Sequence, residues 1–114
     1  MDTKHAVDAL AALAQNSRLA VFRHLVQLAP DGACPGDIAE KLELPAATLS
    51  FHLKALQHAG LVAADKSGRF IHYRANFVAM RDLVDFLSQN CCGGDPGKCA
   101  PPARVASARV PAKT

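Results

Sequence analysis

Residues 35–74 read PGDIAEKLELPAATLSFHLKALQHAGLVAADKSGRFIHYR, and this stretch decides the fold. Pro35 suits the first turn of a short helix, because its missing N–H is not needed there. Leu44-Pro45 ends that helix, and a second helix is predicted from about residue 46 to residue 59, closed by a glycine. Two short helices separated by so tight a break predict a helix-turn-helix.

A β-hairpin is predicted directly after the second of these helices. Residues 61–63 and 70–74 are rich in strand-forming residues, and Ser67-Gly68 supplies a turn between them. A basic hairpin that follows a helix-turn-helix predicts a winged helix-turn-helix, in which the second helix enters the major groove of DNA. The fold class is therefore mainly α with a small β-hairpin.

The predicted helix over residues 46–59 has two different faces. Leu49, Leu53 and Leu56 recur at helical spacing and form an apolar stripe. The opposite, outward face carries Ala47, Ser50, Phe51, Lys54 and His58. An outward phenylalanine beside a lysine is unusual on a face that meets only water, so a rival hypothesis is an adaptor that binds another protein through Phe51.

The remaining chain predicts three more helices. They span residues 3 to about 14 with Thr3 as cap, residues 16 or 17 to about 29, and residues 77–89. Their apolar stripes are Val7, Leu10 and Leu13; Leu19, Phe22, Leu25, Val26 and Leu28; and Phe77, Met80, Leu83, Val84 and Leu87. We expect residues 1–90 to form one domain, residues 91–99 a cysteine-rich segment, and residues 100–114 a disordered tail.

Length and composition exclude several classes of protein. With 114 residues, 50% of them apolar, the chain builds one modest core. No apolar run approaches the roughly 20 residues that span a bilayer, so we expect a cytoplasmic protein with no membrane partner. Thiols stay reduced in that compartment, which favours ligand or redox roles for the four cysteines over structural disulfides.

Positive charge is concentrated in the middle of the chain. Residues 46–79 contain four basic side chains and one acid, whereas residues 1–45 contain four basic and six acidic side chains. A polyanion is therefore expected to bind the central segment. Double-stranded DNA is the polyanion that a winged helix-turn-helix predicts.

Three cysteines follow the last predicted helix as CCGGDPGKC, at positions Cys91, Cys92 and Cys99. The glycines and proline between them provide the reversals that bring three thiolates together. Three soft ligands without histidine favour a thiophilic centre, and As(III), which forms three bonds to sulfur, matches this number. Sb(III) would use the same thiolates, and cadmium or lead stay open. The alternative is redox sensing through a bridge from Cys99 to one of its two partners.

The chain resembles the ArsR/SmtB family of metal- and metalloid-responsive bacterial repressors over roughly residues 5–90. The resemblance rests on the segments Asp37-Ile38-Ala39, Ser50-Phe51-His52-Leu53-Lys54-Ala55-Leu56, Ala59-Gly60-Leu61-Val62, Gly68-Arg69 and Tyr73. It implies a homodimer formed through the first and last helices. It also implies that the second helix of the motif reads an inverted-repeat operator.

The resemblance also places the DNA contacts. It assigns base edges to Ala47, Ser50 and His52, phosphates to Thr48 and Lys54, and backbone or minor-groove contacts to Lys66 and Arg69. His52 has a second interpretation, because it flanks the leucine stripe and could be a half-buried structural histidine.

The ligand residues of two other types in the family are missing from this sequence, which narrows the choice of inducer. Positions 34, 36 and 39 hold Cys34, Gly36 and Ala39, so the Cys-x-Cys-x-x-Cys site of one arsenic-responsive type is missing, and we expect Cys34 to be a small buried hydrophobe. The last helix offers no histidine for the zinc-type interface site. We therefore expect a repressor released by arsenite, with redox sensing as the alternative, and neither enzymatic activity nor an organic cofactor.

Overall fold

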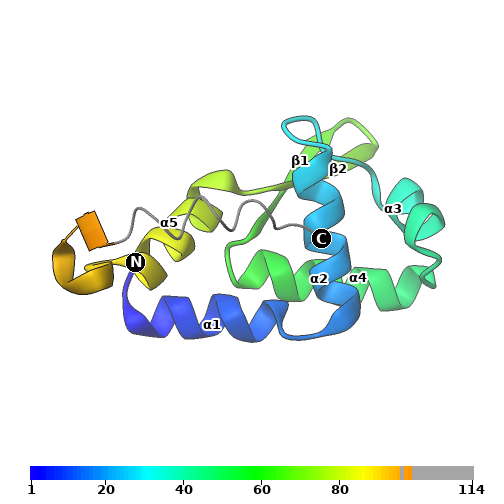
Figure 1. Ribbon diagram of the computed structural model, residues 1–114. Helices are drawn as coiled ribbons and strands as arrows, with labels where there is room; N and C mark the ends of the chain where they lie inside the picture. The colour runs from blue at the N-terminus through cyan, green and yellow to red at the C-terminus, as the bar shows by residue number, and fades with distance from the viewer. Residues whose placement is uncertain (96, 99–114) are drawn as a thin grey trace.

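The computed structural model describes residues 1–95, 97 and 98. Within them the chain forms five α-helices, a two-stranded antiparallel hairpin and one 3-10 turn (Figure 1). Their bounds are α1 Thr3–Leu13, α2 Asn16–Gln27, α3 Pro35–Leu42, α4 Ala46–His58, β1 Val62–Ser67, β2 Phe70–Ala75, α5 Phe77–Ser88 and the turn Cys91–Gly94. The predicted winged helix-turn-helix is confirmed, with α3 and α4 as its two helices and β1–β2 as its wing.

The core lies where α2 crosses α4. The α4 stripe of Leu49, Leu53 and Leu56 is buried as predicted, each side chain at most 1% exposed. From α2, Val21 and Leu25 pack into the same cluster. The first and last residues of the predicted α2 stripe, Leu19 and Leu28, are exposed and do not belong to this core. These contacts fix α4 through one side only, so its opposite side is available for binding.

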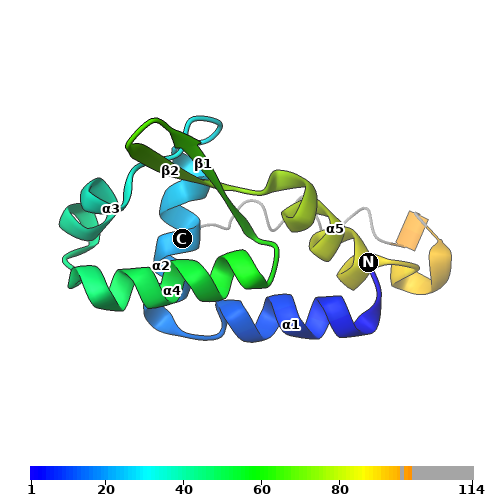
Figure 2. The same cartoon turned by 180° about the vertical axis from the view of Figure 1, so that it is seen from behind.

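Helix α1 packs against the rest of the subunit through small side chains. Its buried residues are alanines, Ala6, Ala9 and Ala12, whereas Val7 and Leu10 are exposed. The small side chains allow α1 to lie close to α4 and α5, which it contacts along the lower edge in Figure 2. The helix begins with Asp2 as its cap, whose carboxylate accepts a hydrogen bond from the His5 N–H, rather than with Thr3.

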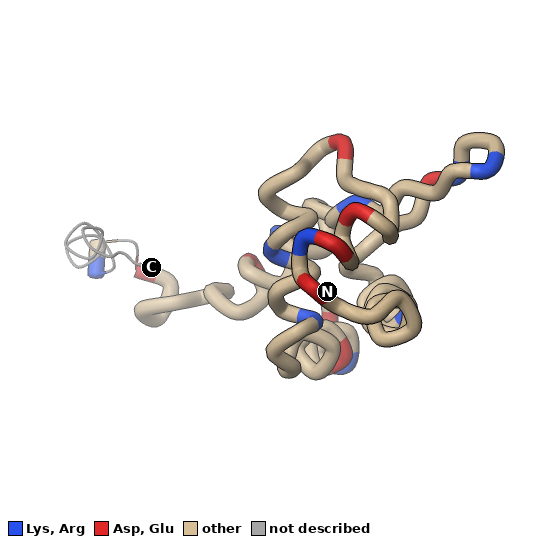
Figure 3. The backbone as a smooth tube through the Cα atoms, turned by 90° about the vertical axis from the view of Figure 1, so that its right-hand side faces the viewer, with Lys and Arg blue, Asp and Glu red and all other residues tan. Residues whose placement is uncertain are grey.

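The wing is longer than predicted, and its turn lies one residue later. The two strands pair from Val62 opposite Ala75 to Ser67 opposite Phe70. The two-residue turn is therefore Gly68-Arg69, with Gly68 at a positive φ of 63° that suits this type of hairpin. The hairpin extends away from the helices and carries basic residues at its tip (Figure 3).

One additional backbone pair attaches the wing to the helical body. Ala33 and Tyr73 form an isolated antiparallel bridge, with N···O distances of 2.9 and 2.8 Å in the two directions. Gly32 precedes this bridge at a φ of 78°, and a Cβ atom there would lie 2.1 Å from the carbonyl oxygen of Tyr73. Only glycine allows this close approach.

Helix α5 leads away from the wing toward α1. Its cap, Asn76, accepts a hydrogen bond from the Ala79 N–H and donates one to the Gly60 carbonyl at 2.9 Å, which ties the start of α5 to the end of α4. Leu83 is buried against the core. None of the helices in the described part of the chain is long and apolar enough to cross a membrane.

Candidate nucleic-acid interface and thiol site

The outward face of α4 is exposed along its whole length. Ala47, Ser50 and Lys54 lie on it, Thr48 is exposed at the first turn, and Phe51 is 64% exposed at its centre. Because the leucine stripe holds the other side of the helix in the core, this face can enter a groove without disturbing the fold. Four of the side chains for which DNA contact was predicted on α4 are therefore accessible.

His52 is the exception among the predicted α4 contacts. It is only 7% exposed, and its Nδ1 atom is buried without a hydrogen-bond partner in the described structure. Burial lowers the pKa of His52 below its ordinary value of 6.5, and the nearby charge of Arg18 lowers this pKa further. The side chain does not lie on the exposed face, which matches its interpretation as a structural histidine rather than a contact to a base edge.

The buried imidazole makes stability depend on pH. Since the pKa of His52 is depressed in the folded chain, the unfolded chain binds more protons once the pH falls below about 6.5. We expect the free energy of unfolding of the wild type to fall from pH 7.5 to pH 5.5 more steeply than that of His52→Gln. Urea titrations at both pH values measure the difference, and parallel profiles for the two proteins would contradict it.

Arg18, at the start of α2, contacts Phe51 on the outward face of α4. Its guanidinium carbon lies 5.9 Å from the centroid of the Phe51 ring, within the range of cation–π attraction. From the sequence, phosphate contact or local packing was expected of Arg18, but its contact with Phe51 was not predicted, because no local pattern relates position 18 to position 51. A groove of about 670 Å³ opens beside this pair, between α1 and α4.

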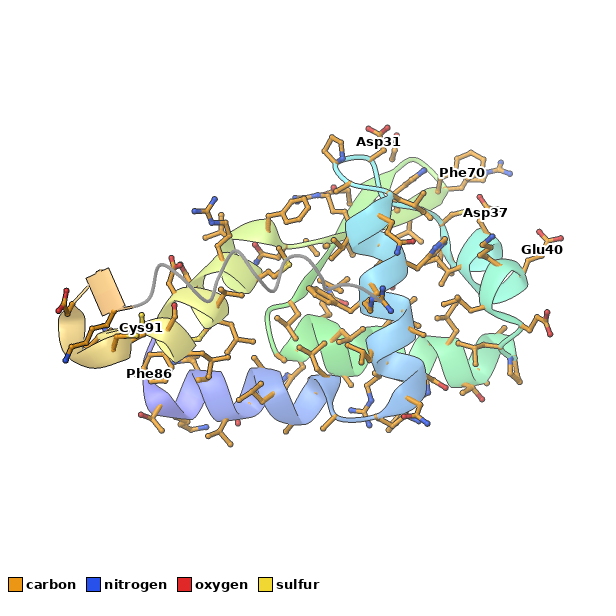
Figure 4. All side chains as sticks on the ribbon, viewed as in Figure 1. Asp31, Asp37, Glu40, Phe70, Phe86 and Cys91 are labelled. Carbon is orange, nitrogen blue, oxygen red and sulfur yellow. The ribbon has the colours of Figure 1, made fainter. Side chains whose placement is uncertain are left out.

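The wing tip presents two cations and one aromatic ring. Lys66 and Arg69 are exposed, as their predicted DNA contacts require. Phe70 is 69% exposed beside them, and Figure 4 shows its ring pointing away from the body of the protein. Farther from the tip, Arg74 donates a hydrogen bond to Asp65, which raises the pKa of the guanidinium. The charge of Arg74 is therefore paired within the hairpin.

Cys91 and Cys92 lie on the 3-10 turn that follows α5, and both are exposed. The helix has already ended at Ser88, and positive φ angles at Asn90 (58°) and Cys92 (54°) reverse the chain. The last helix was predicted over residues 77–89, so its end before the cysteine pair is confirmed, and two adjacent thiols can reach one ion only where the helix has ended. Within the described residues no group of three potential metal ligands is assembled.

The third predicted ligand, Cys99, lies outside the described residues, as do residues 100–114, for which disorder was predicted. The chemistry of the two described donors fits a thiophilic ion, since both are sulfur atoms. They are accessible at the end of α5, where an ion could approach from solvent. The three-thiolate site thus stays a prediction with two of its members placed.

Cys34 does not belong to this site. It caps the N-terminus of α3, is half-buried rather than fully buried, and donates a hydrogen bond from Sγ to the Asp37 carboxylate at 3.2 Å. Asp37 and Cys91 lie at opposite ends of the molecule in Figure 4. A single ion therefore cannot bind Cys34 together with the cysteines after α5 in the same chain.

Large apolar side chains are exposed on both α1 and α5. Val7 and Leu10 of α1 are 56% and 42% exposed, and Val84 and Leu87 of α5 are 56% and 61% exposed. The two helices contact each other at this end (Figures 1 and 2). We call these four side chains the seam surface.

Comparison with known proteins agrees with this architecture. A family model described as a helix-turn-helix domain matches residues 13–63. The chain is 30% identical over 93 residues to the uncharacterized HTH-type transcriptional regulator YbzH of Bacillus subtilis, which covers 71% of this chain and 93% of that protein. It is 37% identical over 65 residues to the HTH-type transcriptional repressor SmtB of Mycobacterium tuberculosis, 57% of this chain and 46% of that protein.

Solved structures lead to the same family. The ArsR-like transcriptional regulator from Rhodococcus sp. RHA1 has a TM-score of 0.70 and 25% sequence identity, over 92% of each chain. The fold of this chain therefore matches that of a regulator of this kind along nearly its whole length. The sequence of this chain in turn matches that of YbzH. The chain belongs to the ArsR/SmtB family of winged helix-turn-helix transcriptional regulators.

Proposed function

We propose that the protein is a homodimeric repressor that leaves its operator when As(III) binds the thiolates of Cys91, Cys92 and Cys99. The observation that carries this proposal is the exposed pair Cys91-Cys92 on a turn directly after α5. Sb(III) is also thiophilic and would use the same three thiolates, which makes it a second inducer of the same site.

The DNA contact uses the outward face of α4 and the wing. Ala47 and Ser50 meet base edges, Thr48 and Lys54 meet phosphates, and Lys66 and Arg69 meet the backbone or minor groove at the wing. Because these contacts neutralise several phosphates, operator affinity falls steeply with salt. A protein adaptor that binds through apolar contacts would show little salt dependence.

The dimer forms through the seam surface of Val7, Leu10, Val84 and Leu87. These side chains are large and apolar, and all four are exposed in the single chain. Contact with a second subunit would remove them from water. A two-fold dimer presents two α4 helices to successive turns of an inverted-repeat operator, which is how a small domain with a formal charge of only +3 binds tightly.

The site lies where it can influence that dimer. Cys91 and Cys92 follow α5 after a short break, and α5 carries two members of the seam surface. Joining the thiolates through one ion fixes the end of α5 and favours a dimer in which the two α4 helices no longer match the operator. A coupling of about 1–3 kcal/mol would weaken DNA binding about 5–150-fold.

Fluorescence anisotropy on the gene's own upstream promoter DNA tests the proposal. Titrating the reduced wild type with arsenite is expected to release the DNA at about one ion per chain and weaken binding about 5–150-fold. Cys92→Ser is expected to bind DNA normally and to ignore arsenite, because two sulfur atoms remain for an ion that forms three bonds.

Cys34→Ser is the matched control, since this thiol lies away from the site, and it should respond as the wild type does. Zinc and a mild oxidant are added in parallel. DNA binding that ignores arsenite and is lost reversibly on oxidation would replace the inducer by thiol redox chemistry. Failure of the wild type to bind the promoter DNA would contradict the repressor itself.

A further inference from the structure

Phe51 is an aromatic ring without a role in the core. It lies at the centre of the outward face of α4 with 64% of its surface exposed, whereas the core face of the same helix is filled by the leucine stripe. The proposed contacts on this face, Ser50 and Lys54, are polar and flank it in sequence. Transfer of such a ring from water into a contact is favourable, so its position marks a place where a partner's apolar surface is expected.

Two neighbours hold the ring in this exposed position. The guanidinium of Arg18 lies over it, 5.9 Å from the ring centroid. The imidazole of His52 lies 5.8 Å away, with an angle of 59° between the two ring planes, a tilted arrangement that aromatic pairs favour. Since His52 is itself buried, it forms a fixed support. The ring is thus ordered before any partner arrives, which reduces the entropy lost on binding.

The charges around Phe51 show which partner fits. The adjoining groove between α1 and α4 is lined by the basic side chains Lys4, Arg18, Lys54 and His58. Asp8 is the one acid among the described residues that line it, and its carboxylate is paired with Lys4 at 3.2 Å. An aromatic ring beside the positive charges of Arg18 and Lys54 suits a polyanion that also offers an apolar group, rather than an apolar protein surface.

DNA offers such a group in the major groove. Base edges there present hydrogen-bond donors and acceptors, and thymine alone adds a methyl group at C5. A phenyl ring has no polar atom with which to read the other edges. We infer that Phe51 contacts the C5-methyl group of a thymine and thereby specifies thymine at one position of each operator half-site. This inference rests on the proposed function, because it requires α4 to enter the major groove.

Uracil-substituted DNA tests the inference directly, since uracil lacks only that methyl group. The promoter fragment is amplified once with dTTP and once with dUTP, and both forms are titrated with wild type and with Phe51→Ala. Each lost methyl contact is expected to cost about four-fold in affinity, hence about ten-fold or more for two half-sites. The wild type should show this loss on uracil DNA, and Phe51→Ala should show it already on thymine DNA.

The decisive quantity is the coupling between the two changes. The penalty for uracil is expected to be about ten-fold smaller in Phe51→Ala than in the wild type, and Phe51→Leu should retain part of it. Circular dichroism checks that the variants fold, as the exposure of Phe51 leads us to expect.

Phe70→Ala is the matched control, because Phe70 is as exposed but lies on the wing, where the C5-methyl group is out of reach. Its effect and that of uracil should multiply without coupling. An equal uracil penalty in wild type and Phe51→Ala would overturn the inference while leaving the repressor intact. If the wild type binds neither fragment, the proposed function fails and the inference fails with it.

Discussion

Gly32→Ala is expected to lower the free energy of unfolding by about 3 kcal/mol or more. Gly32 has a φ of 78°, and a non-glycine residue held in this region costs about 1–3 kcal/mol. The added Cβ would also lie 2.1 Å from the Tyr73 carbonyl oxygen, so the backbone has to move. Movement would break the hydrogen bonds between Ala33 and Tyr73, each worth about 0.5–1.5 kcal/mol.

Urea unfolding at fixed protein concentration, followed by circular dichroism, measures this effect. Gly36→Ala is the matched control, because Gly36 lies in α3 and nothing would come within 4 Å of its new Cβ. Alanine is the better helix former, so the control should be unchanged or stabilised by up to about 1 kcal/mol. A Gly32→Ala protein within 1 kcal/mol of the wild type would show that the wing does not need the bridge at Ala33.

Leu87→Glu is expected to convert the dimer to monomer and to weaken operator binding by about 100-fold. Leu87 is 61% exposed in the single chain, so the substitution leaves the fold of each subunit intact. In the proposed dimer it places a charge inside the seam surface, where it would be desolvated without a partner. DNA affinity then falls because two linked recognition helices bind about 10²–10⁴-fold better than separate ones.

Sedimentation and anisotropy on the promoter fragment measure the two effects. Val78→Glu provides the control on the same helix, since Val78 is 71% exposed and lies on the side of α5 that also carries Asp82 and Asp85. This variant should remain dimeric and bind DNA as before, apart from a small effect of the added charge. A dimeric Leu87→Glu protein with normal affinity would move the subunit contact elsewhere.

The sequence predicted the parts of the fold that follow from local signals. The break at Leu44-Pro45 and the stripe of Leu49, Leu53 and Leu56 were sufficient to place α4 and its buried face. The last helix, predicted over residues 77–89, likewise ends before the cysteine pair. In each case neighbouring residues determine the backbone, so no knowledge of distant parts of the chain was needed.

The spacing of apolar residues along a helix does not reveal whether an apolar stripe packs inside the subunit or against another one. In α1 the periodicity of Val7 and Leu10 marked an apolar stripe without saying what covers it, and the residues packed inside the subunit are alanines because α1 lies close to its neighbours. An apolar stripe looks the same whether it faces the chain's own core or a second subunit. Size, rather than hydrophobicity, separated the two faces in this helix.

The surroundings of Phe51 depend on residues that are distant in sequence. Arg18 and Phe51 are 33 positions apart, and their contact exists only because α2 crosses α4. The burial of His52 follows from the same crossing, which is why its position at the flank of the stripe left two interpretations open. Such tertiary contacts leave no pattern within either helix.

The end of α5 at Ser88 separates, along the sequence, the residues proposed to contact DNA from the cysteines proposed to bind the inducer. The face of α4 and the wing lie within residues 46–75, whereas Cys91 and Cys92 follow Ser88 on a turn of their own. If the proposed function is correct, substitutions after residue 88 alter the response to an inducer without touching a side chain proposed to contact DNA. In evolutionary terms a lineage could exchange its chemical signal while it keeps its target genes, and an engineered biosensor could be retuned in the same way.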